Sequence, residues 1–275
     1  MADSLKRFGF RTIILVCDEN PIFHPTDLEF MHIDDLALEE TQILKKKYGK
    51  KSNAFRWGLK PVFVKHLLTN SGFNKVIYVD NDICFFANPM HLFELLQQHS
   101  ILLTPHFYEA NTEKNQSWLE ANFRIGLYNA GFIGVNQDAI EMLDWWRKAC
   151  VYAMKKAFWR GLYDDQKYLD LVPILFDKTY IIKEYGHNLA SWNERYQENK
   201  LKEQNDQVVF IHFTPHTIQA FKKSENTFKF YFDTYSKMVE KRGFDRRFLN
   251  KRNWRLDFSD FIFYMKWRLV RIFEK

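Results

Sequence analysis

The chain has 275 residues, of which 46% are hydrophobic and 27% are charged, with a net charge of +6. These proportions are typical of globular proteins and exclude the disordered and collagen-like classes, and the length fits one large core. The positive charge comes from residues 241–275, which hold eleven Lys and Arg against four Asp and Glu. The other 240 residues are almost neutral, which argues against a nucleic-acid-binding protein.

Nothing in the sequence points to secretion or to a membrane span. No apolar run approaches the roughly 20 residues that a membrane-spanning helix requires. The first residues lack an apolar stretch followed by a small-residue cleavage site, so we expect no secretory signal. Cys17, Cys84 and Cys150 are odd in number and far apart, which is not typical of a disulfide framework or a zinc site. We therefore expect a cytoplasmic protein.

Short apolar runs alternate with longer amphipathic stretches, which predicts an α/β fold with a mixed, mostly parallel central sheet flanked by helices. The expected strands cover residues 11–17, 75–80, 100–104, 131–135, 179–182 and 207–213. The expected helices cover residues 53–68, 90–97, 137–156, 165–171 and 234–241. We interpret the polar stretch 194–206 as an exposed loop. Residues 1–240 are expected to form the main domain and residues 241–275 a C-terminal tail.

The clearest local feature is an apolar strand that ends in Asp80-Asn81-Asp82. Residues at i and i+2 point to the same side of a strand, so both carboxylates converge at the carboxyl edge of the sheet, where open α/β folds bind ligands. Two hard oxygen donors suit Mg²⁺ or Mn²⁺, and such an ion can hold a diphosphate group. A solvated turn explains the same residues, and this motif alone leaves both interpretations open.

Three further motifs follow along the chain. In Asn129-Ala130-Gly131, small residues let the backbone approach a ligand, and the amide both donates and accepts hydrogen bonds. Asp165-Gln166 begins a short helix, and His212 ends a strand. Each also has an ordinary structural explanation: a glycine turn, acidic groups that favour a helix N-terminus, and a histidine packed in a strand.

Together these motifs resemble the nucleotide-sugar glycosyltransferases of the GT-A fold, most closely glycosyltransferase family 8 and its bacterial relatives. The resemblance covers residues 10–215. It implies that Asp80 and Asp82 bind Mn²⁺ or Mg²⁺, with His212 as the third protein ligand, and that Asn81 belongs to the donor site. The motif Asn129-Ala130-Gly131 would then lie beside the donor sugar.

The same resemblance assigns further residues to the site. Asp165 and Gln166 would lie near the anomeric carbon of the donor. The stretch 185–193 resembles the Asn-x-x-x-Trp-Asn segment of bacterial members, which gives Asn188 and Trp192 a sugar-facing role.

Two features depart from the family pattern. The first strand of the family is missing, because a helix end at residues 2–7 leads directly into the strand expected at 11–17. Either the chain is shortened at its N-terminus or another element completes the nucleotide pocket. The Lys that contacts diphosphate in the family is also absent after His212. Arg56 and Lys60 are our candidates for the substitute cation, a solvated helix face being the alternative, and Lys222–Lys223 are less specific.

The resemblance implies transfer of a hexose from a nucleoside diphosphate sugar, with a UDP-sugar as the expected donor, to a glycan or lipid-linked glycan. Configuration would be retained. Because no carboxylate is assignable as a covalent nucleophile, we favour departure and attack on the same face of the sugar. Asp165 and Gln166 would stabilise the developing positive charge or orient the acceptor.

Aromatic residues alternate with cations in residues 241–275. A helix of this composition is suited to lie in the headgroup layer of an anionic membrane, which would place the protein at the inner face of the cell membrane. A terminal helix that packs on the catalytic domain is the alternative.

Two other functions compete with glycosyl transfer. Asp80-Asn81-Asp82 fits the opening motif of haloacid-dehalogenase-like phosphatases, although that motif normally lies near the N-terminus. A shortened transferase that binds glycan or membrane without turnover is the second alternative.

Overall fold

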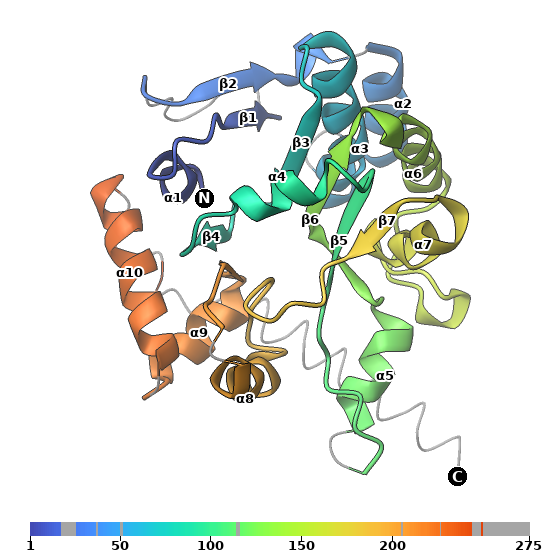
Figure 1. The fold of residues 1–275 in the computed structure, drawn as a ribbon. Helices are drawn as coiled ribbons and strands as arrows, with labels where there is room; N and C mark the ends of the chain where they lie inside the picture. Colours follow the sequence, from blue (N-terminus) through green and yellow to red (C-terminus); the bar gives the residue numbers. More distant parts are fainter. Residues whose placement is uncertain are drawn as a thin grey trace. The chain divides into compact units, whose positions relative to one another are not determined.

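The computed structural model describes residues 1–17, 26–36, 38–49, 52–113, 116–204, 206–225, 227–243 and 249. The chain forms two compact units, Met1–Ala220 and Phe221–Lys275. The first unit contains every candidate site residue named above except Lys222 and Lys223, the less specific candidates for the substitute cation, which belong to the second unit. Helices and strands alternate along it, which confirms the α/β class (Figure 1).

The bounds of the elements are as follows. The strands are β1 (Ile13–Val16), β2 (Glu29–His32), β3 (Lys75–Val79), β4 (Ile83–Phe85), β5 (Ile101–Pro105), β6 (Tyr128–Asn136), β7 (Thr179–Ile181) and β8 (Phe210–His212). The α-helices are α1 (Ala2–Lys6), α2 (Leu38–Tyr48), α3 (Asn53–Asn70), α4 (Met90–Leu95), α5 (Gln116–Arg124), α6 (Ile140–Tyr152), α7 (Val172–Leu175), α8 (Glu194–Gln204), α9 (Pro215–Lys223) and α10 (Thr227–Lys241). The short 3-10 helices are η1 (Ile33–Asp35), η2 (Gln137–Ala139), η3 (Phe158–Arg160) and η4 (Gln166–Leu171).

The central sheet contains four strands in the order β3-β6-β5-β7. Strand β6 is antiparallel to β3 and to β5, whereas β5 and β7 are parallel. Three of these strands therefore share one direction and β6 opposes them, so the sheet is mixed. Two small sheets are separate from it: the parallel pair β1-β2 and the antiparallel pair β4-β8.

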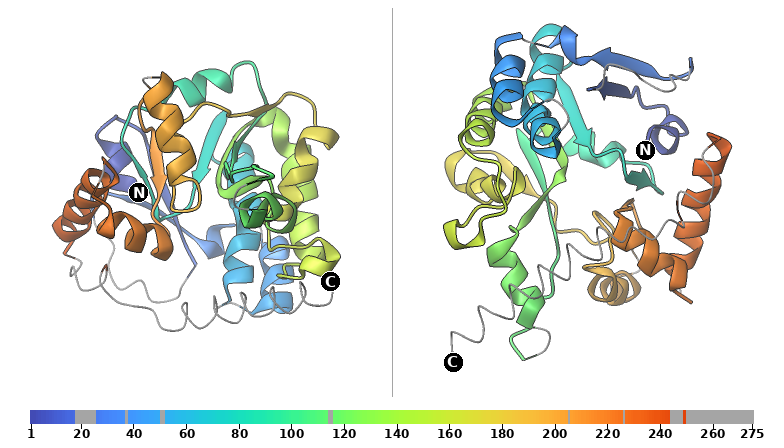
Figure 2. Two further views of the ribbon diagram at one scale, coloured as in Figure 1. Left: turned by 90° about the horizontal axis from the view of Figure 1, so that it is seen from below. Right: turned by 180° about the vertical axis from the view of Figure 1, so that it is seen from behind.

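Strands β5 and β6 are buried on both faces, and alternate residues supply two different cores. Leu103 and Ile133 belong to the core that contains residues of α2, α3 and α6. Leu102 and Phe132 belong to the second core, which α4, β4 and β8 complete. Helices α2, α3 and α6 pack side by side next to the central sheet (Figures 1 and 2). The sheet is thus fixed from both sides.

The loop prediction for residues 194–206 is wrong, because residues 194–204 form helix α8. Lys202 and Glu198 lie one turn apart on this helix and form an ion pair at 2.8 Å, which stabilises the helix. Gln197 is fully buried: its Oε1 accepts from the Gly186 amide and its Nε2 donates to the His187 carbonyl. Tertiary hydrogen bonds, which have no signature in the sequence, fix this helix.

The sheet is interrupted between β1 and β3. Among the described strands, β1 pairs only with β2, and β3 pairs only with β6. Helix α1 precedes β1, in the place where the sequence predicted a helix end. No further strand of the described chain pairs with the free edge of β1 or of β3. The two strands therefore border an opening in the sheet.

The described part of the chain contains no helix with both the length and the apolar content needed to cross a bilayer. Most of the basic aromatic tail, 241–275, lies outside the described residues. The proposed membrane anchor therefore stays a prediction.

We predict that Gly186→Ala destabilises the protein more than Gly72→Ala. Both glycines have positive φ, at +87° and +72°, so alanine is strained at either position, by about 1 kcal/mol. Of the two, only at Gly186 would a Cβ also clash with backbone, at the Gln207 carbonyl oxygen, whereas nothing lies within 4 Å at Gly72. Urea unfolding should show a further loss of about 1–3 kcal/mol for Gly186→Ala. Equal losses in the two variants would show that the Gln207 contact is not rigid.

Candidate active site

The candidate site begins with a carboxylate pair in the turn between β3 and β4 and a histidine from β8. Asp80 follows β3, Asp82 precedes β4, and His212 ends β8. In the β4-β8 ribbon, Ile83 pairs with His212, and this register brings the ring beside Asp82. One ligand atom from each of Asp80, Asp82 and His212 lies within 4.8 Å of the others. This is the metal trio that the sequence predicted, and the structure brings its members together.

Burial and neighbouring charges shift the pKa values of two members of the metal trio. His212 Nε2 lies 3.0 Å from Asp82 Oδ1. Burial acts to raise the pKa of Asp82, but the hydrogen bond and charge of His212 outweigh it and lower that pKa. Burial likewise acts to lower the pKa of His212, but the Asp82 carboxylate raises it. Both carboxylates keep part of their side chains exposed, 25% for Asp80 and 34% for Asp82, so a ligand can reach them.

Behind the metal trio lies a buried ammonium group. Helix α3 carries Lys60, whose side chain is only 4% exposed. Its Nζ lies 3.3 Å from Asp80 Oδ1 and 3.1 Å from Asp165 Oδ2, and it donates to the Ala130 carbonyl at 3.0 Å. Burial acts to lower the pKa of Lys60, but the two carboxylates raise it, so Lys60 stays charged. Lys60 therefore holds together three parts of the predicted site.

Tyr78 is a site residue that the sequence analysis missed. It lies two residues before Asp80 on the same face of β3, and its hydroxyl donates to Asp80 Oδ1 at 2.7 Å. Burial, together with the neighbouring carboxylate, raises the pKa of Tyr78, so the hydroxyl keeps its proton. The period-two spacing was the signal that could have identified it.

Gly131 lies against the metal trio. A Cβ at this position would be 2.7 Å from His212 Cε1 and 3.2 Å from Asp80 Oδ2. Such contacts are too short, so a larger residue would displace a ligand. The backbone here also positions Asp80, since the Asp80 amide donates to the Gly131 carbonyl at 2.8 Å.

Asn129 connects the metal trio to the loop between β7 and α8. Its Nδ2 lies 3.2 Å from Asn188 Oδ1 and 3.2 Å from His212 Nδ1, while its Oδ1 accepts from the Gly131 amide. Asn188 is fully buried with a φ of +55° and donates to the Pro105 carbonyl. The ring of Trp192 packs edge-on against His212, with centroids 5.7 Å apart. Asn129 and Trp192 therefore contact His212, and Asn188 is joined to it through Asn129.

Asp165 and Gln166 lie on the other side of Lys60. Asp165 is buried, and burial raises its pKa while Lys60 acts to lower it. Gln166 begins η4 and its Nε2 donates to the Ile125 carbonyl at 3.4 Å. The preceding Asp164 has a φ of +48°, and burial raises its pKa to about 6. Asp164 was not among the sequence candidates.

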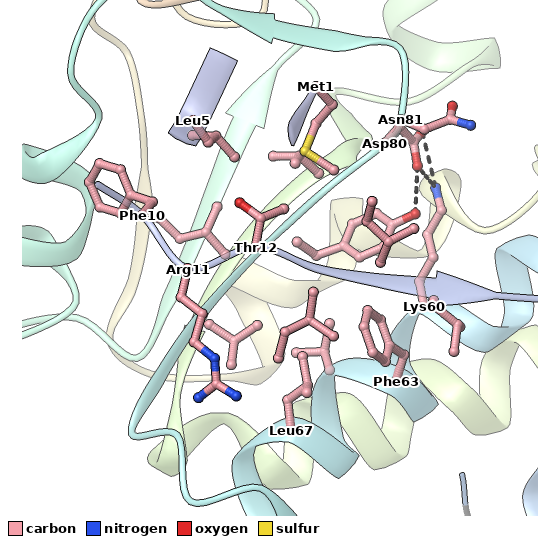
Figure 3. A pocket seen from close by; sticks show the side chains of 18 of the residues that line it. Met1, Leu5, Phe10, Arg11, Thr12, Lys60, Phe63, Leu67, Asp80 and Asn81 are labelled. Atoms are coloured by element: carbon pink, nitrogen blue, oxygen red, sulfur yellow. Dashed lines mark hydrogen bonds and ion pairs between the residues drawn. The ribbon is translucent and has the colours of Figure 1, made fainter. Parts of the chain in front are cut away.

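A cavity of about 570 Å³ lies between β1, β3 and α3, at the interruption of the sheet. Asp80, Asn81, Asp82, Arg56 and Lys60 contribute to its lining. Figure 3 shows Lys60, Asp80 and Asn81 together at one end, whereas Leu5 and Phe10 lie towards the other. The cavity is therefore charged where it meets the metal trio and more apolar farther along, where Arg11 and Thr12 also line it. Arg56 is exposed on α3, and its Nη1 donates to Asn53 Oδ1 at 3.4 Å.

Both the mixed α/β fold and the acidic edge of its sheet are typical of enzymes that bind a metal-associated phosphate ligand. The sequence profile of glycosyl transferase family 8 matches residues 18–217. The chain belongs to this family, and the predicted family is confirmed. Glycosyltransferases are thus the class of protein to which the family and the fold point.

Similar sequences include two uncharacterized proteins of Bacillus subtilis (strain 168). YfnF is 30% identical over 197 residues, which cover 66% of this chain and 63% of YfnF. YfnD is 30% identical over 183 residues, which cover 65% of this chain and 56% of YfnD. The chain therefore spans less than two thirds of the length of either relative.

Similar solved structures include two glycosyltransferases. Mouse xyloside xylosyltransferase 1 in its apo form has a TM-score of 0.42 and 16% identity, over 69% of this chain and 76% of that protein. The glycosyltransferase GlyE of Streptococcus pneumoniae TIGR4 has a TM-score of 0.40 and 15% identity, over 68% of this chain and 40% of that protein.

We predict that Gly131→Ala weakens Mn²⁺ binding at least about tenfold, because the new methyl group displaces His212 or Asp80. Gly134→Ala is the matched control in the same strand, since its Cβ would press only on the Leu102 side chain, at 2.9 Å. Titration calorimetry with Mn²⁺ measures the affinity, and urea unfolding measures the stability. An unchanged Mn²⁺ affinity in Gly131→Ala would contradict the assignment of the metal trio.

We also predict that His106 makes the protein less stable in acid. Complete burial lowers the pKa of His106 to about 3, and its Nδ1 donates to the Gly126 carbonyl at 3.0 Å. The unfolded chain binds a proton near pH 6.5 but the folded chain does not, so stability falls as the pH drops from 6.5 towards 3. The expected slope is about 1.4 kcal/mol per pH unit from this residue.

Urea unfolding at several pH values tests the acid effect. His106→Asn retains an amide group that can donate to the Gly126 carbonyl. It should reduce the pH dependence of the free energy of unfolding by the contribution of about one proton. A slope that is the same in the unmodified chain and in His106→Asn would contradict the role of His106.

Proposed function

We propose that this protein transfers a hexose from a nucleoside diphosphate sugar, with a UDP-sugar as the expected donor, to a hydroxyl group of a glycan or lipid-linked glycan. The observation that carries the proposal is the convergence of Asp80, Asp82 and His212 beside a cavity, in a chain of glycosyl transferase family 8.

The metal trio fits a divalent cation. Two carboxylates from the turn between β3 and β4 converge with an imidazole from β8, and both carboxylates are partly exposed. With neutral His212, the three carboxylates of Asp80, Asp82 and Asp165 exceed the one ammonium of Lys60 by two negative charges, which a divalent cation offsets. Oxygen ligands favour Mn²⁺ or Mg²⁺. When bound, such an ion acts as a Lewis acid towards the departing diphosphate.

The residues of the chain have separate tasks in this proposal. Lys60 is held between Asp80 and Asp165, so it fixes both carboxylates rather than reaching out to the donor. Arg56 is exposed, lines the cavity and is the better candidate for the diphosphate. Asn129 and Trp192 contact His212 and Asn188 bonds to Asn129, which supports their assignment to the side of the site that holds the donor sugar.

The pairing of Asp165 supports a retaining mechanism without a covalent intermediate. A carboxylate nucleophile must be able to approach the anomeric carbon, whereas Asp165 is buried and its Oδ2 is 3.1 Å from the Lys60 ammonium. We assign Asp165 an electrostatic role towards the positive charge that develops on the sugar. Gln166 would orient the acceptor. Departure of the diphosphate and attack by the acceptor then occur on the same face.

The contacts of Asp80 favour transfer over phosphoester hydrolysis. In a haloacid-dehalogenase-like phosphatase the first aspartate is the nucleophile. Here Asp80 accepts a hydrogen bond from Tyr78 and is paired with Lys60, which reduces its nucleophilicity. Family membership points the same way. Attachment to the inner face of the cell membrane through residues 241–275 remains part of the proposal.

We predict that one nucleoside diphosphate sugar raises the melting temperature in the presence of Mn²⁺ and is slowly hydrolysed. A ligand that binds only the folded state stabilises it by mass action, so no acceptor is needed for the test. Asp82→Asn should abolish the Mn²⁺-dependent shift and reduce hydrolysis on the order of 100-fold or more. Thermal denaturation and release of free nucleoside diphosphate are the two measurements.

Asp138→Asn is the matched control, because it makes the same chemical change in an exposed ion pair with Lys178. It should behave like the unmodified chain. If no donor has an effect, the proposal fails and a glycan-binding protein without turnover becomes the better explanation. Release of phosphate from a simple phosphoester, without any nucleotide sugar, would instead support the phosphatase alternative.

A further inference from the structure

The side chain of Trp192 contacts two histidine rings. Trp192 lies near the end of the loop between β7 and α8, in the stretch 185–193 that we call the 185–193 loop. Its ring meets the ring of His212 at an interplanar angle of 80°, with centroids 5.7 Å apart. It meets the ring of His106, which follows β5, at 66° and 5.9 Å. Edge-to-face contacts of this kind favour one relative orientation of the rings.

The polar atom of the Trp192 side chain is committed to the protein backbone. Its Nε1 donates to the His106 carbonyl at 3.0 Å. An indole ring has no second donor and no acceptor. This N–H group is therefore occupied and cannot serve a sugar hydroxyl, whereas it does fix the plane of the ring that packs on His212.

Two further side chains hold the 185–193 loop at the same place. Asn193 Nδ2 donates to the His106 carbonyl at 2.7 Å, and Asn188 Nδ2 donates to the Pro105 carbonyl at 3.0 Å. Both asparagine side chains are buried. Together with Trp192, three donors of the loop end on two successive carbonyls at the end of β5. A shift of the loop would leave buried polar groups without partners, which is costly.

The anchor of Trp192 is itself fixed. His106 is buried, its amide donates to the Leu127 carbonyl at 2.9 Å, and its Nδ1 donates to the Gly126 carbonyl at 3.0 Å. The ring of His106 also stacks on Tyr108, with centroids 4.8 Å apart and planes 9° from parallel. The carbonyl that receives the indole N–H group thus has little freedom to move.

The remaining contacts of the His212 ring leave one motion weakly restrained. Asp82 lies 3.0 Å from Nε2, and Asn129 Nδ2 lies 3.2 Å from Nδ1. Contacts at the two nitrogens act near the plane of the ring, so they resist a tilt about the line joining the nitrogens only weakly. A second ring packed almost at a right angle resists this tilt. Trp192 supplies that ring.

We propose that Trp192 is a positioning residue, which holds the imidazole of His212 in the orientation that metal binding requires. The inference rests on the metal trio of the proposed function and goes beyond it, because Trp192 acts on the metal site through His212. A contact between Trp192 and the donor sugar alone is the competing explanation. The two explanations differ in whether Trp192 matters when no sugar is present.

The test is a calorimetric titration of Mn²⁺ alone into the full chain, without any nucleotide sugar. Trp192→Leu removes the ring and its N–H group and should weaken Mn²⁺ binding at least about tenfold, as the loss of a group that orients a metal ligand typically does. Trp192→Phe keeps an aromatic edge for His212 but loses the anchor on His106, so it should recover part of the affinity. An unchanged Mn²⁺ affinity in both variants would overturn the proposal in favour of the sugar contact.

Trp145→Leu is the matched control. It makes the same chemical change in a tryptophan of α6 whose ring meets that of Phe176 at 63° and 5.7 Å. It should bind Mn²⁺ like the unmodified chain, and an equal loss in this variant would overturn the proposal. Circular dichroism checks folding, and if Trp192→Leu does not fold, the Mn²⁺ affinity of Trp192→Phe decides.

The titration also separates this inference from the proposed function. If the unmodified chain binds Mn²⁺ and both Trp192 variants bind it equally well, the positioning role is wrong and the metal trio stands. If the unmodified chain does not bind Mn²⁺, the metal trio is wrong and the positioning role fails with it.

Discussion

The site depends on one buried cation. Lys60 reaches from α3 to the carboxylates of Asp80 and Asp165 and to the carbonyl of Ala130, and it has almost no contact with solvent. Withdrawing an ammonium from water costs several kcal/mol, which only well-placed opposite charges offset. Both aspartates must therefore stay ionised and in position, and removal of either would leave Lys60 insufficiently paired. The geometry of the metal trio follows from this constraint.

The ion pair with Lys60 also gives the two sides of the Asp80 carboxylate different surroundings. Lys60 fixes the rear of Asp80, and Tyr78 occupies Asp80 Oδ1, while the partly exposed side of the carboxylates still faces the cavity. Asp82 and His212 complete the set from the β4-β8 ribbon, whose pairing is antiparallel and separate from the central sheet. Gly131 keeps the space between these groups free of side-chain atoms. The candidate metal site thus lies where two sheets meet a buried ion pair.

The interrupted sheet explains the character of the cavity. Its polar end belongs to the metal trio, whereas its apolar length runs between two strands that each pair on one side only, among the described residues. The proposed donor uses the polar end. On the other side of the site, Asn129 connects the metal trio to the 185–193 loop, and the histidine pair His91–His187 lies at the start of that loop.

The sequence by itself determined the α/β class, the family and most strands, because apolar runs of period two and the motif Asp80-Asn81-Asp82 are local signals. It could not show that Lys60 pairs with two carboxylates, since the partners lie 20 and 105 positions away and a buried lysine looks like an exposed one in sequence. It also missed α8, whose hydrogen bonds from Gln197 are tertiary. The pairing of His91 with His187, 96 positions apart, arises only when β7 and α4 are folded together. Local patterns specify elements, whereas charge pairing and ligand geometry depend on which distant segments the fold brings into contact.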